Sequence, residues 1–161
     1  MSSTKLLAFI VTISDTRSLE TDESGETLAQ LLVSANVEIV GKLIVSDDLD
    51  DIRSTLMVLS DRDDVNLVLT TGGTGFAPRD NTPEATRDVI DREAPGIAEA
   101  MRRETAEKTP MAMLSRGVAG VRNGTLIINM PGSPKAVAEC FEVIRPVLQH
   151  AVNLLAGESS H

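Results

Sequence analysis

Runs of residues with strand character alternate with runs of helical character along the whole sequence, and this alternation restricts the fold more than any other feature. The strand-like runs cover residues 5–13, 37–45, 65–71 and 125–130. The first run is continuous and β-branched toward its end, which is typical of a strand that is buried on both faces. Because helical crossovers separate the runs, the sequence predicts an α/β three-layer sandwich, with a mostly parallel sheet and helices on both faces.

Helical periodicity and capping signals locate the crossovers. Helices are expected to begin near Ser24, after the acidic cluster at residues 47–51, at Thr82, after Pro95 and at Ser133. Thr82 and Ser133 are each followed by proline, a pattern that favours a capped helix start. The sequence therefore provides a helix between each pair of predicted strands.

Three further expectations concern the later helices and the core. The helix that begins at Thr82 is expected to run to about Glu93, and Pro146 is expected to kink or split the last helix. Cys140 lies on the apolar stripe of that helix and is expected to be a small buried side chain. The methionines are also expected to fill the core rather than form a binding surface: Met57, Met101, Met111, Met113 and Met130.

Composition narrows the class of protein. The 161 residues, 42% of them hydrophobic, suit a single domain over residues 1–161. A formal net charge of −9 repels a phosphate backbone, so no nucleic-acid partner is expected. One cysteine excludes a disulfide framework and a thiolate zinc site. No apolar run reaches the roughly 20 residues that cross a bilayer, and no signal-peptide cleavage pattern follows the first strand, so a cytoplasmic protein without a membrane partner is expected.

The loop at residues 72–75 follows a buried strand and has the sequence Gly72-Gly73-Thr74-Gly75. In a parallel sheet, ligands bind at the carboxyl ends of the strands, where this loop lies. Its glycines let backbone N–H groups approach an anion closely. It lacks the lysine of a Walker A loop and the third glycine of a dinucleotide-binding loop. It is therefore either a phosphate-binding loop of another kind or a tight turn without a ligand.

Charged side chains follow two of the strands. Asp47 closes the second strand, and Arg79-Asp80 precede the helix that begins at Thr82. Arginine can pair with phosphate, and carboxylates can hold Mg²⁺ through oxygen. Two acids beside an anion-binding loop suggest a metal held between the protein and a nucleotide phosphate. Each acid alone is also consistent with helix capping, and Arg79 and Asp80 are also consistent with a surface ion pair.

The turn that starts the last helix offers a second anion site. Ser133 and the free N–H groups of the helix start could bind an anion, and Lys135 adds positive charge. A plain helix cap is the alternative. Ser115 lies beside Arg116, but no histidine is near in sequence, so a serine nucleophile is not expected.

Several segments, in this order and spacing, resemble the signature of the MoaB/MogA family of molybdenum-cofactor biosynthesis, which includes the G domain of gephyrin. They are TGGTG at 71–75, PRD at 78–80, TPEAT at 82–86, MLSR at 113–116 and TLIINMPGSPK at 125–135. The resemblance covers about residues 5–157. It implies molybdopterin adenylyl transfer, in which the terminal phosphate of molybdopterin attacks the α-phosphorus of MgATP. It also implies a trimer or a hexamer, and a separate molybdotransferase that takes the product.

The resemblance also assigns roles to individual residues. Asp47 and Asp80 are the expected catalytic acids and would position Mg²⁺ and the triphosphate. The expected nucleotide-binding residues are Ser14, Asp15, Ser24, Gly25, Gly72, Gly73, Thr74, Gly75 and Arg79. The expected molybdopterin-binding residues are Ser115, Asn129, Pro131, Gly132, Ser133 and Lys135.

Three alternatives stay open at this point. The first is a molybdopterin-binding scaffold protein that keeps the fold but has lost catalysis, although the retained Arg79-Asp80 pair favours an active enzyme. The second is a flavodoxin-like electron carrier, which the absence of Tyr and Trp disfavours. The third is a nucleotide-recycling domain of the competence-damage type, from which the segments 113–116 and 129–135 differ.

Overall fold

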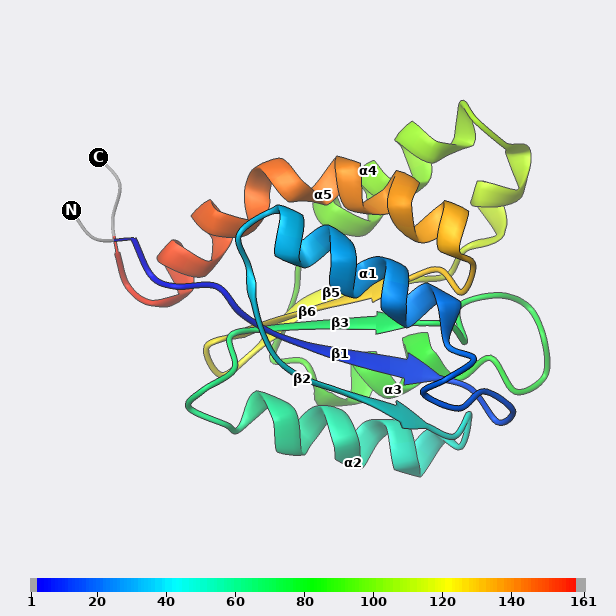
Figure 1. The fold of residues 1–161 in the computed structure, drawn as a ribbon, viewed down its shortest axis with the longest axis horizontal. Coiled ribbons are helices and arrows are strands. Elements are labelled where there is room, and N and C mark those ends of the chain that lie inside the picture. Colours follow the sequence, from blue (N-terminus) through cyan, green and yellow to red (C-terminus); the bar gives the residue numbers. More distant parts are fainter. Residues whose placement is uncertain (1–2, 159–161) are drawn as a thin grey trace.

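The computed structural model describes residues 3–158 and contains one six-stranded sheet between two layers of helices (Figure 1). The strands are β1 (Leu7–Ile13), β2 (Glu38–Val45), β3 (Leu67–Thr71), β4 (Arg92–Glu93), β5 (Ala119–Arg122) and β6 (Thr125–Met130). Their order in the sheet is β2-β1-β3-β6-β5-β4. The first four in that order are parallel to one another, whereas β5 pairs antiparallel with both of its neighbours. The predicted α/β sandwich with a mostly parallel sheet is confirmed.

The helices divide between the two faces of the sheet. They are α1 (Glu23–Ser34), α2 (Leu49–Ser60), α3 (Thr82–Val89), α4 (Pro95–Ala106), the 3₁₀ helix η1 (Pro110–Leu114) and α5 (Pro134–Leu155). One face is covered by α1, α4 and α5, and the other by α2 and α3 (Figure 1). Over residues 3–158, no helix is both long and apolar enough to cross a membrane.

Alternate residues of the central strands supply the two apolar cores. In β1, Ala8 and Ile10 pack toward α1 and α5, whereas Phe9 and Val11 pack toward α2. Successive side chains of a strand point to opposite faces, so a strand covered on both sides must be apolar at every position. This requirement explains why the first strand-like run is continuous in the sequence.

The short strands β4 and β5 were not predicted from the sequence. The helix expected to reach Glu93 ends at Val89, because the chain then turns into β4 and pairs with β5. Asp91 N–H donates to the Val121 carbonyl at 2.7 Å, so strand pairing replaces further helical turns. The sequence analysis also missed β5, although Asn123-Gly124, with Asn123 at a φ of 53°, is a typical hairpin turn between β5 and β6.

Pro146 does not split the last helix, because α5 is a single helix from Pro134 to Leu155. Pro146 is exposed, so the helix carbonyl that it leaves without a partner can face water. Buried side chains on both sides of it, Phe141, Ile144, Leu148 and Val152, hold the helix on the core. Cys140 is buried, as predicted.

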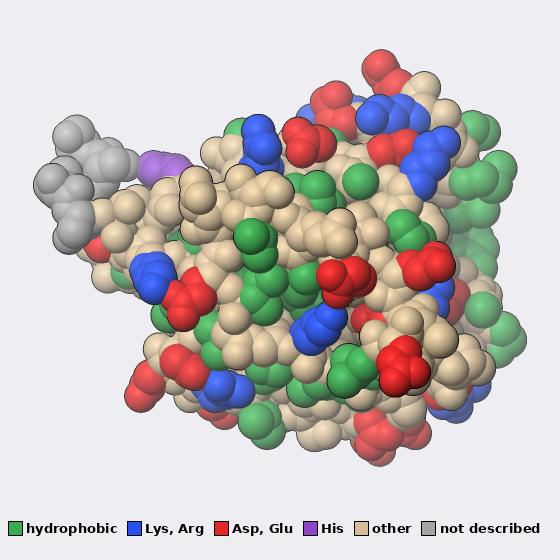
Figure 2. Space-filling view, in the orientation of Figure 1, with side chains coloured by type: hydrophobic (Ala, Val, Ile, Leu, Met, Phe, Trp, Pro, Cys, Tyr) green, Lys and Arg blue, Asp and Glu red, His purple; other side chains and the backbone are tan. Residues whose placement is uncertain are grey.

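The expectation for the methionines was only partly right. Met101 and Met130 are buried, but Met57, Met111 and Met113 are exposed. Met111 and Met113 belong to η1, a short segment in which no residue is buried. Figure 2 shows hydrophobic side chains gathered at the right-hand edge of the molecule, and the exposed large hydrophobic residues of η1 and the loop after β3 are Phe76, Met111, Met113 and Leu114.

The described core predicts a large difference between neighbouring positions of α1. Leu32 is fully buried, whereas Val33 is 63% exposed. We expect Leu32→Ala to lower the free energy of unfolding by about 2–5 kcal/mol, because it leaves a cavity in the core. Val33→Ala should change it by less than about 0.5 kcal/mol. Urea denaturation at one protein concentration measures both, and equal effects of the two substitutions would contradict the packing described here.

Candidate active site

The glycine-rich loop at residues 72–75 lies at the carboxyl end of β3 and has a backbone that only glycine adopts easily. Gly72 and Gly73 have positive φ angles of 92° and 70°. A Cβ at Gly72 would lie 2.6 Å from the Ile13 carbonyl oxygen, and one at Gly73 would lie 2.2 Å from Thr82 Oγ1. Both positions therefore require glycine for conformation and for space.

Two residues hold the carbonyl oxygens of this loop. The Thr82 hydroxyl and N–H donate to the oxygens of Gly72 and Gly73 at 2.9 and 3.1 Å. Arg116 donates to the oxygens of the next two residues, from its N–H and its Nε, at 2.8 Å each. Within residues 3–158, the N–H groups of residues 73–75 donate to no protein acceptor. The loop therefore presents free N–H donors, which is the arrangement that binds an anion.

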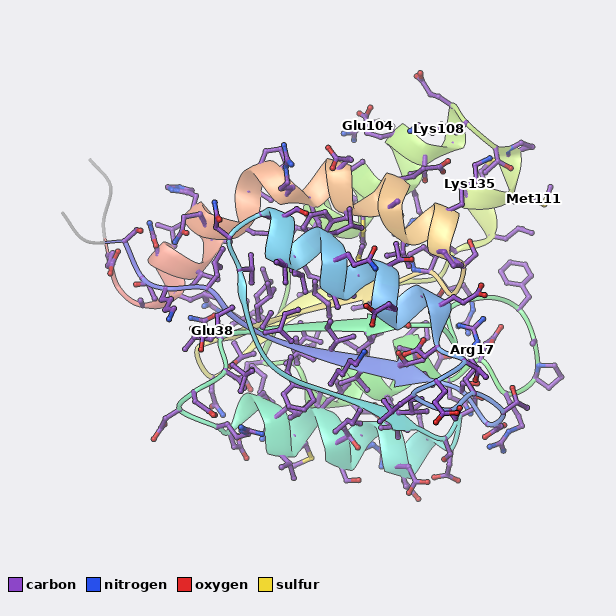
Figure 3. All side chains as sticks on the ribbon, in the orientation of Figure 1. Arg17, Glu38, Glu104, Lys108, Met111 and Lys135 are labelled. Carbon is purple, nitrogen blue, oxygen red and sulfur yellow. The ribbon has the colours of Figure 1, made fainter. Side chains whose placement is uncertain are left out.

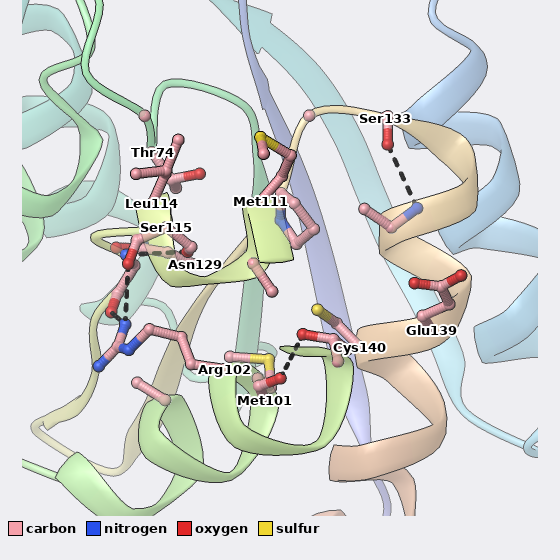
Figure 4. Close-up of a pocket in the computed structure, with 18 of the residues that line it drawn as sticks. Thr74, Met101, Arg102, Met111, Leu114, Ser115, Asn129, Ser133, Glu139 and Cys140 are labelled. Carbon is pink, nitrogen blue, oxygen red and sulfur yellow. Dashed lines mark hydrogen bonds between the residues drawn. The ribbon is translucent and has the colours of Figure 1, made fainter. Parts of the chain in front are cut away.

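A cavity of about 500 Å³ lies beside this loop, between α4, η1 and the start of α5 (Figure 4). Five polar residues on its wall belong to the predicted substrate sites: Thr74, Asp80, Ser115, Asn129 and Ser133. Four others were not predicted: Arg102, Thr105, Thr109 and Glu139. Apolar side chains of α4, η1 and α5 complete it: Ala98, Met101, Met111, Leu114, Ala136 and Cys140. A mostly apolar pocket with a few convergent polar groups is typical of a small-molecule site.

Two sources of N–H donors border the cavity. One is the glycine-rich loop, and the other is the N-terminus of α5, where the Ser133 hydroxyl caps the helix by accepting from Ala136 N–H at 3.2 Å. Both segments are in contact, since a Cβ at Gly132 would lie 3.3 Å from the Cα of Gly72. The helix start adds partial positive charge at the same place. The cavity can therefore accept an anionic ligand although the chain is acidic.

The two predicted catalytic acids lie at the same edge of the sheet but in different positions. Asp80 lines the cavity, and its carboxylate accepts from Ala77 N–H at 2.9 Å. Asp47 does not line the cavity. It is linked to the residue that follows Asp80, because the Asn81 side-chain amide donates to the Asp47 carbonyl at 2.9 Å. The structure thus brings the acids to one region without placing both on the cavity wall.

Asp47 instead pairs closely with Asp15. Each carboxylate accepts a hydrogen bond from the other residue's N–H, at 2.9 and 3.0 Å, and this joins the loops after β1 and β2. Arg79 donates two hydrogen bonds to the Asp15 carboxylate, at 2.7 and 3.0 Å. The predicted surface ion pair of Arg79 is therefore with Asp15, not with Asp80.

This cluster shifts the acidities of its two carboxyl groups in opposite directions. The hydrogen bonds from Arg79 lower the pKa of Asp15 to about 2. Burial raises the pKa of Asp47, and the negative charge of Asp15 raises it further. The ionised form of Asp47 therefore lacks a sufficient counter-charge, and a bound cation would stabilise it.

The serine and glycine expected on the nucleotide side lie deeper than expected. Ser24 and Gly25 are buried at the start of α1, and neither lines the cavity. Asp22 caps this helix by accepting from Gly25 N–H at 2.9 Å and also accepts from the Thr12 hydroxyl at 2.6 Å. Ser14 shapes the loop after β1, since its hydroxyl accepts from the N–H groups of the second and third residues that follow. None of Ser14, Ser24 and Gly25 lines the cavity.

The residues expected on the molybdopterin side separate into three groups. Ser115, Pro131, Gly132 and Ser133 line the cavity. Asn129 also lines it, but its buried side-chain amide is hydrogen-bonded within the protein. Its Oδ1 accepts a hydrogen bond from Val118 N–H, and its Nδ2 donates to the hydroxyls of Thr70 and Thr86. Lys135 is exposed and does not line the cavity, although it lies at the same end of the molecule as Arg17 and Met111 (Figure 3).

Three arginines of the site were not predicted as site residues. Arg17 Nη1 donates to the Ser24 hydroxyl at 2.9 Å and to the Gly132 carbonyl at 3.3 Å, which links the loops after β1 and β6. Arg102 lines the cavity and donates to the Gly117 carbonyl at 2.8 Å. Arg116 holds the glycine-rich loop. Arg17 lies between the expected nucleotide-binding residues Asp15 and Ser24, so its place in the sequence could have indicated it. The contacts of Arg102 and Arg116 depend on the tertiary fold.

The donor groups near the cavity suit a hard divalent cation. Over residues 3–158, no three His, Cys, Asp or Glu side chains converge on a metal position. Mg²⁺ is commonly held by one or two carboxylates together with substrate phosphates, and it prefers oxygen ligands. Asp80 on the cavity wall and the poorly balanced charge of Asp47 fit this kind of binding.

Comparison with known proteins identifies the family to which the chain is similar. Residues 9–150 match the family described as "Probable molybdopterin binding domain". The crystal structure of a molybdenum cofactor biosynthesis protein B superposes with a TM-score of 0.92 at 36% identity, over 98% of this chain and 99% of that chain.

Two relatives differ in how much of their length this chain spans. The Drosophila melanogaster protein named molybdenum cofactor synthesis protein cinnamon is 46% identical over 155 residues, which are 94% of this chain and 26% of that protein. The Helicobacter pylori J99 protein named molybdopterin adenylyltransferase is 46% identical over 114 residues, which are 71% of this chain and 65% of that protein. From the fold, the cavity residues and these matches, the chain belongs to the MoaB/MogA family of molybdopterin-binding domains.

Proposed function

We propose that this protein is a molybdopterin adenylyltransferase, which transfers AMP from MgATP to the terminal phosphate of molybdopterin. The observation that carries the proposal is the cavity wall, on which free N–H groups of the glycine-rich loop, the Asp80 carboxylate and the N-terminus of α5 meet. The name of the 46% identical Helicobacter pylori relative supports the same activity.

The reaction joins two phosphate-bearing substrates, and the cavity offers two anion-binding segments. We assign the triphosphate to the N–H groups of residues 73–75, and the molybdopterin phosphate to the Ser133 end of α5. An oxygen of the molybdopterin phosphate attacks the α-phosphorus of ATP. The bond from that phosphorus to the bridging oxygen breaks, and pyrophosphate leaves with the electron pair. The attacking phosphate is already anionic, which agrees with a cavity that has no histidine on its wall.

Asp80 and Asp47 are the residues that would hold Mg²⁺. When bound, the ion would neutralise charge on the triphosphate. The protein positions the substrates and compensates charge. Its N–H donors would bind the phosphates, and its carboxylates would bind the cation. Holding the reacting groups in line supplies much of the acceleration of such transfers.

Several further assignments stay predictions for this chain. They are a single molybdopterin-binding domain over residues 1–161, a cytoplasmic location, assembly into a trimer or hexamer, and delivery of the product to a separate molybdotransferase. Ser14, Asp15, Ser24, Gly25 and Arg79 are proposed to support the nucleotide side. Asn129 and Lys135 are proposed to support the molybdopterin side, Asn129 by holding the cavity wall and Lys135 by its charge at the rim.

The proposed function is tested by mixing the purified protein with molybdopterin and MgATP and measuring pyrophosphate. We expect release that requires both substrates and Mg²⁺. Pyrophosphate release from MgATP in the absence of molybdopterin would contradict the assignment of molybdopterin as the acceptor of AMP. Molybdopterin binding without any release would favour the scaffold alternative.

Replacement of Asp80 tests its role on the cavity wall. We expect Asp80→Ala to lower adenylyl transfer by at least about 10²-fold, equivalent to ~2.7 kcal/mol of barrier. Asp80→Asn should also be impaired, because it keeps an acceptor for Ala77 N–H but removes the charge. Asp63→Ala, in the exposed turn before β3, is the control and should retain wild-type turnover. An Asp80→Asn variant with normal turnover would show that the charge is not needed.

Replacement of Asp47 tests the charge imbalance. A carboxyl whose pKa is raised in the folded state contributes stability at low pH, and this contribution is lost as the pH rises through the raised pKa. Asp47→Asn keeps an acceptor for Asp15 N–H and removes the poorly balanced charge. We therefore expect it to raise the free energy of unfolding at neutral pH and to lower adenylyl transfer.

The pH dependence supplies the control for this substitution. The stability gain of Asp47→Asn should disappear below the ordinary pKa of aspartate, where wild-type Asp47 is also neutral. Urea denaturation of both proteins, at neutral pH and at a pH below the ordinary pKa of aspartate, measures the difference in their free energies of unfolding. A gain that is equal at both, or a loss at neutral pH, would contradict the direction of the pKa shift.

A further inference from the structure

We propose that Arg116 is the positioning residue that fixes the glycine-rich loop and Asp80 relative to each other. This inference rests on the proposed adenylyl transfer for its kinetic consequence. It does not assign Arg116 a contact with substrate, because its side chain is not on the cavity wall.

The contacts of Arg116 join three segments that are separate in the sequence. Nε donates to the Gly75 carbonyl and Nη2 to the Asp80 carbonyl, each at 2.8 Å. Nη1 donates to both oxygens of the Glu84 carboxylate, at 2.9 and 2.8 Å. The Arg116 N–H donates to the Thr74 carbonyl at 2.8 Å. One residue thus holds the end of the loop, the catalytic acid's backbone and the first turn of α3.

The segment between these attachment points is a compact turn. Asp80 N–H donates to the Ala77 carbonyl at 2.9 Å, and the Asp80 carboxylate accepts from Ala77 N–H at 2.9 Å. A Cβ at Gly75 would lie 2.9 Å from Asp80 Oδ2, so the carboxylate lies directly over the loop. Because Arg116 holds the carbonyls at both ends of the turn, it sets the distance between the free loop N–H groups and that carboxylate.

The geometry requires a guanidinium group rather than positive charge alone. Three nitrogens of one rigid plane point to three different acceptors, and a lysine ammonium cannot reproduce this fork. The Arg116 and Glu84 side chains are 34% and 43% exposed, so their ion pair contributes little to global stability. Replacing Arg116 should therefore disturb the site more than it disturbs the fold.

The experiment compares Arg116→Lys and Arg116→Ala with the control Arg62→Lys. Arg62 also binds a carboxylate with two nitrogens, that of Asp64, but it lies before β3 at the opposite edge of the sheet. We expect both Arg116 variants to lose about 10²-fold in kcat for pyrophosphate release, because small displacements of reacting groups have effects of this size. Thermal unfolding should stay near wild type, and Arg62→Lys should keep its kcat.

Added guanidinium ion separates positioning from general destabilisation. At concentrations below those that unfold the protein, we expect it to restore part of the activity of Arg116→Ala and none of that of Arg116→Lys, in which the space is filled. Wild-type kcat in Arg116→Lys would overturn the proposal. So would a loss in Arg116→Ala that follows its unfolded fraction and is not rescued.

Amide hydrogen exchange gives a readout that does not depend on activity. We expect the Ala77 and Asp80 N–H groups, which are hydrogen-bonded within the turn, to exchange faster in Arg116→Lys and at an unchanged rate in Arg62→Lys. If the wild type releases no pyrophosphate, the proposed function fails, and faster exchange would still support positioning by Arg116. If the wild type is active and exchange of the Ala77 and Asp80 N–H groups is unchanged in Arg116→Lys, the positioning inference alone is wrong.

Discussion

The site depends on the hydrogen bonds that hold the carbonyl oxygens of residues 72–75. Thr82 and Arg116 supply these bonds from α3 and from the segment before β5. Gly72 N–H donates to the Met130 carbonyl, but the N–H groups of residues 73–75 have no protein acceptor among the described residues and can receive a ligand's oxygens. The glycines are required because side chains would collide with Ile13 and Thr82. Backbone dipoles thus provide positive potential in a chain whose net charge is −9.

The same principle explains how an acidic protein can bind two phosphate-bearing substrates. Its positive groups at this edge of the sheet are local and are fixed by neighbours: Arg79 by Asp15, and Arg116 by Glu84. The negative pair of Asp15 and Asp47 is not on the cavity wall. The acidic residues Asp80 and Glu139 line the cavity together with the free N–H donors of the loop. This combination of donors and carboxylates suits a ligand that arrives with a divalent cation.

The sequence predicted what depends on periodicity and position along the chain. Runs with strand character identify β1, β2, β3 and β6, and the carboxyl-end rule then selects the loops that carry Gly73, Asp80 and Ser133. Contacts between distant segments could not be predicted in this way. The pairing of Arg79 with Asp15, and the burial of Ser24 behind the Asp22 cap, follow from how the loops after β1 and β3 meet. The two-residue strand β4 has no periodic signal and forms only because β5 lies beside it.

The most direct test of this account is a titration of the protein with MgATP, followed through backbone amide resonances by NMR. The account predicts that the largest chemical-shift changes occur at the N–H groups of Gly73, Thr74 and Gly75, while Gly41 and Gly124, which lie outside the cavity, change little. Saturable binding with the amides of residues 73–75 unmoved would contradict it, as would the absence of MgATP binding.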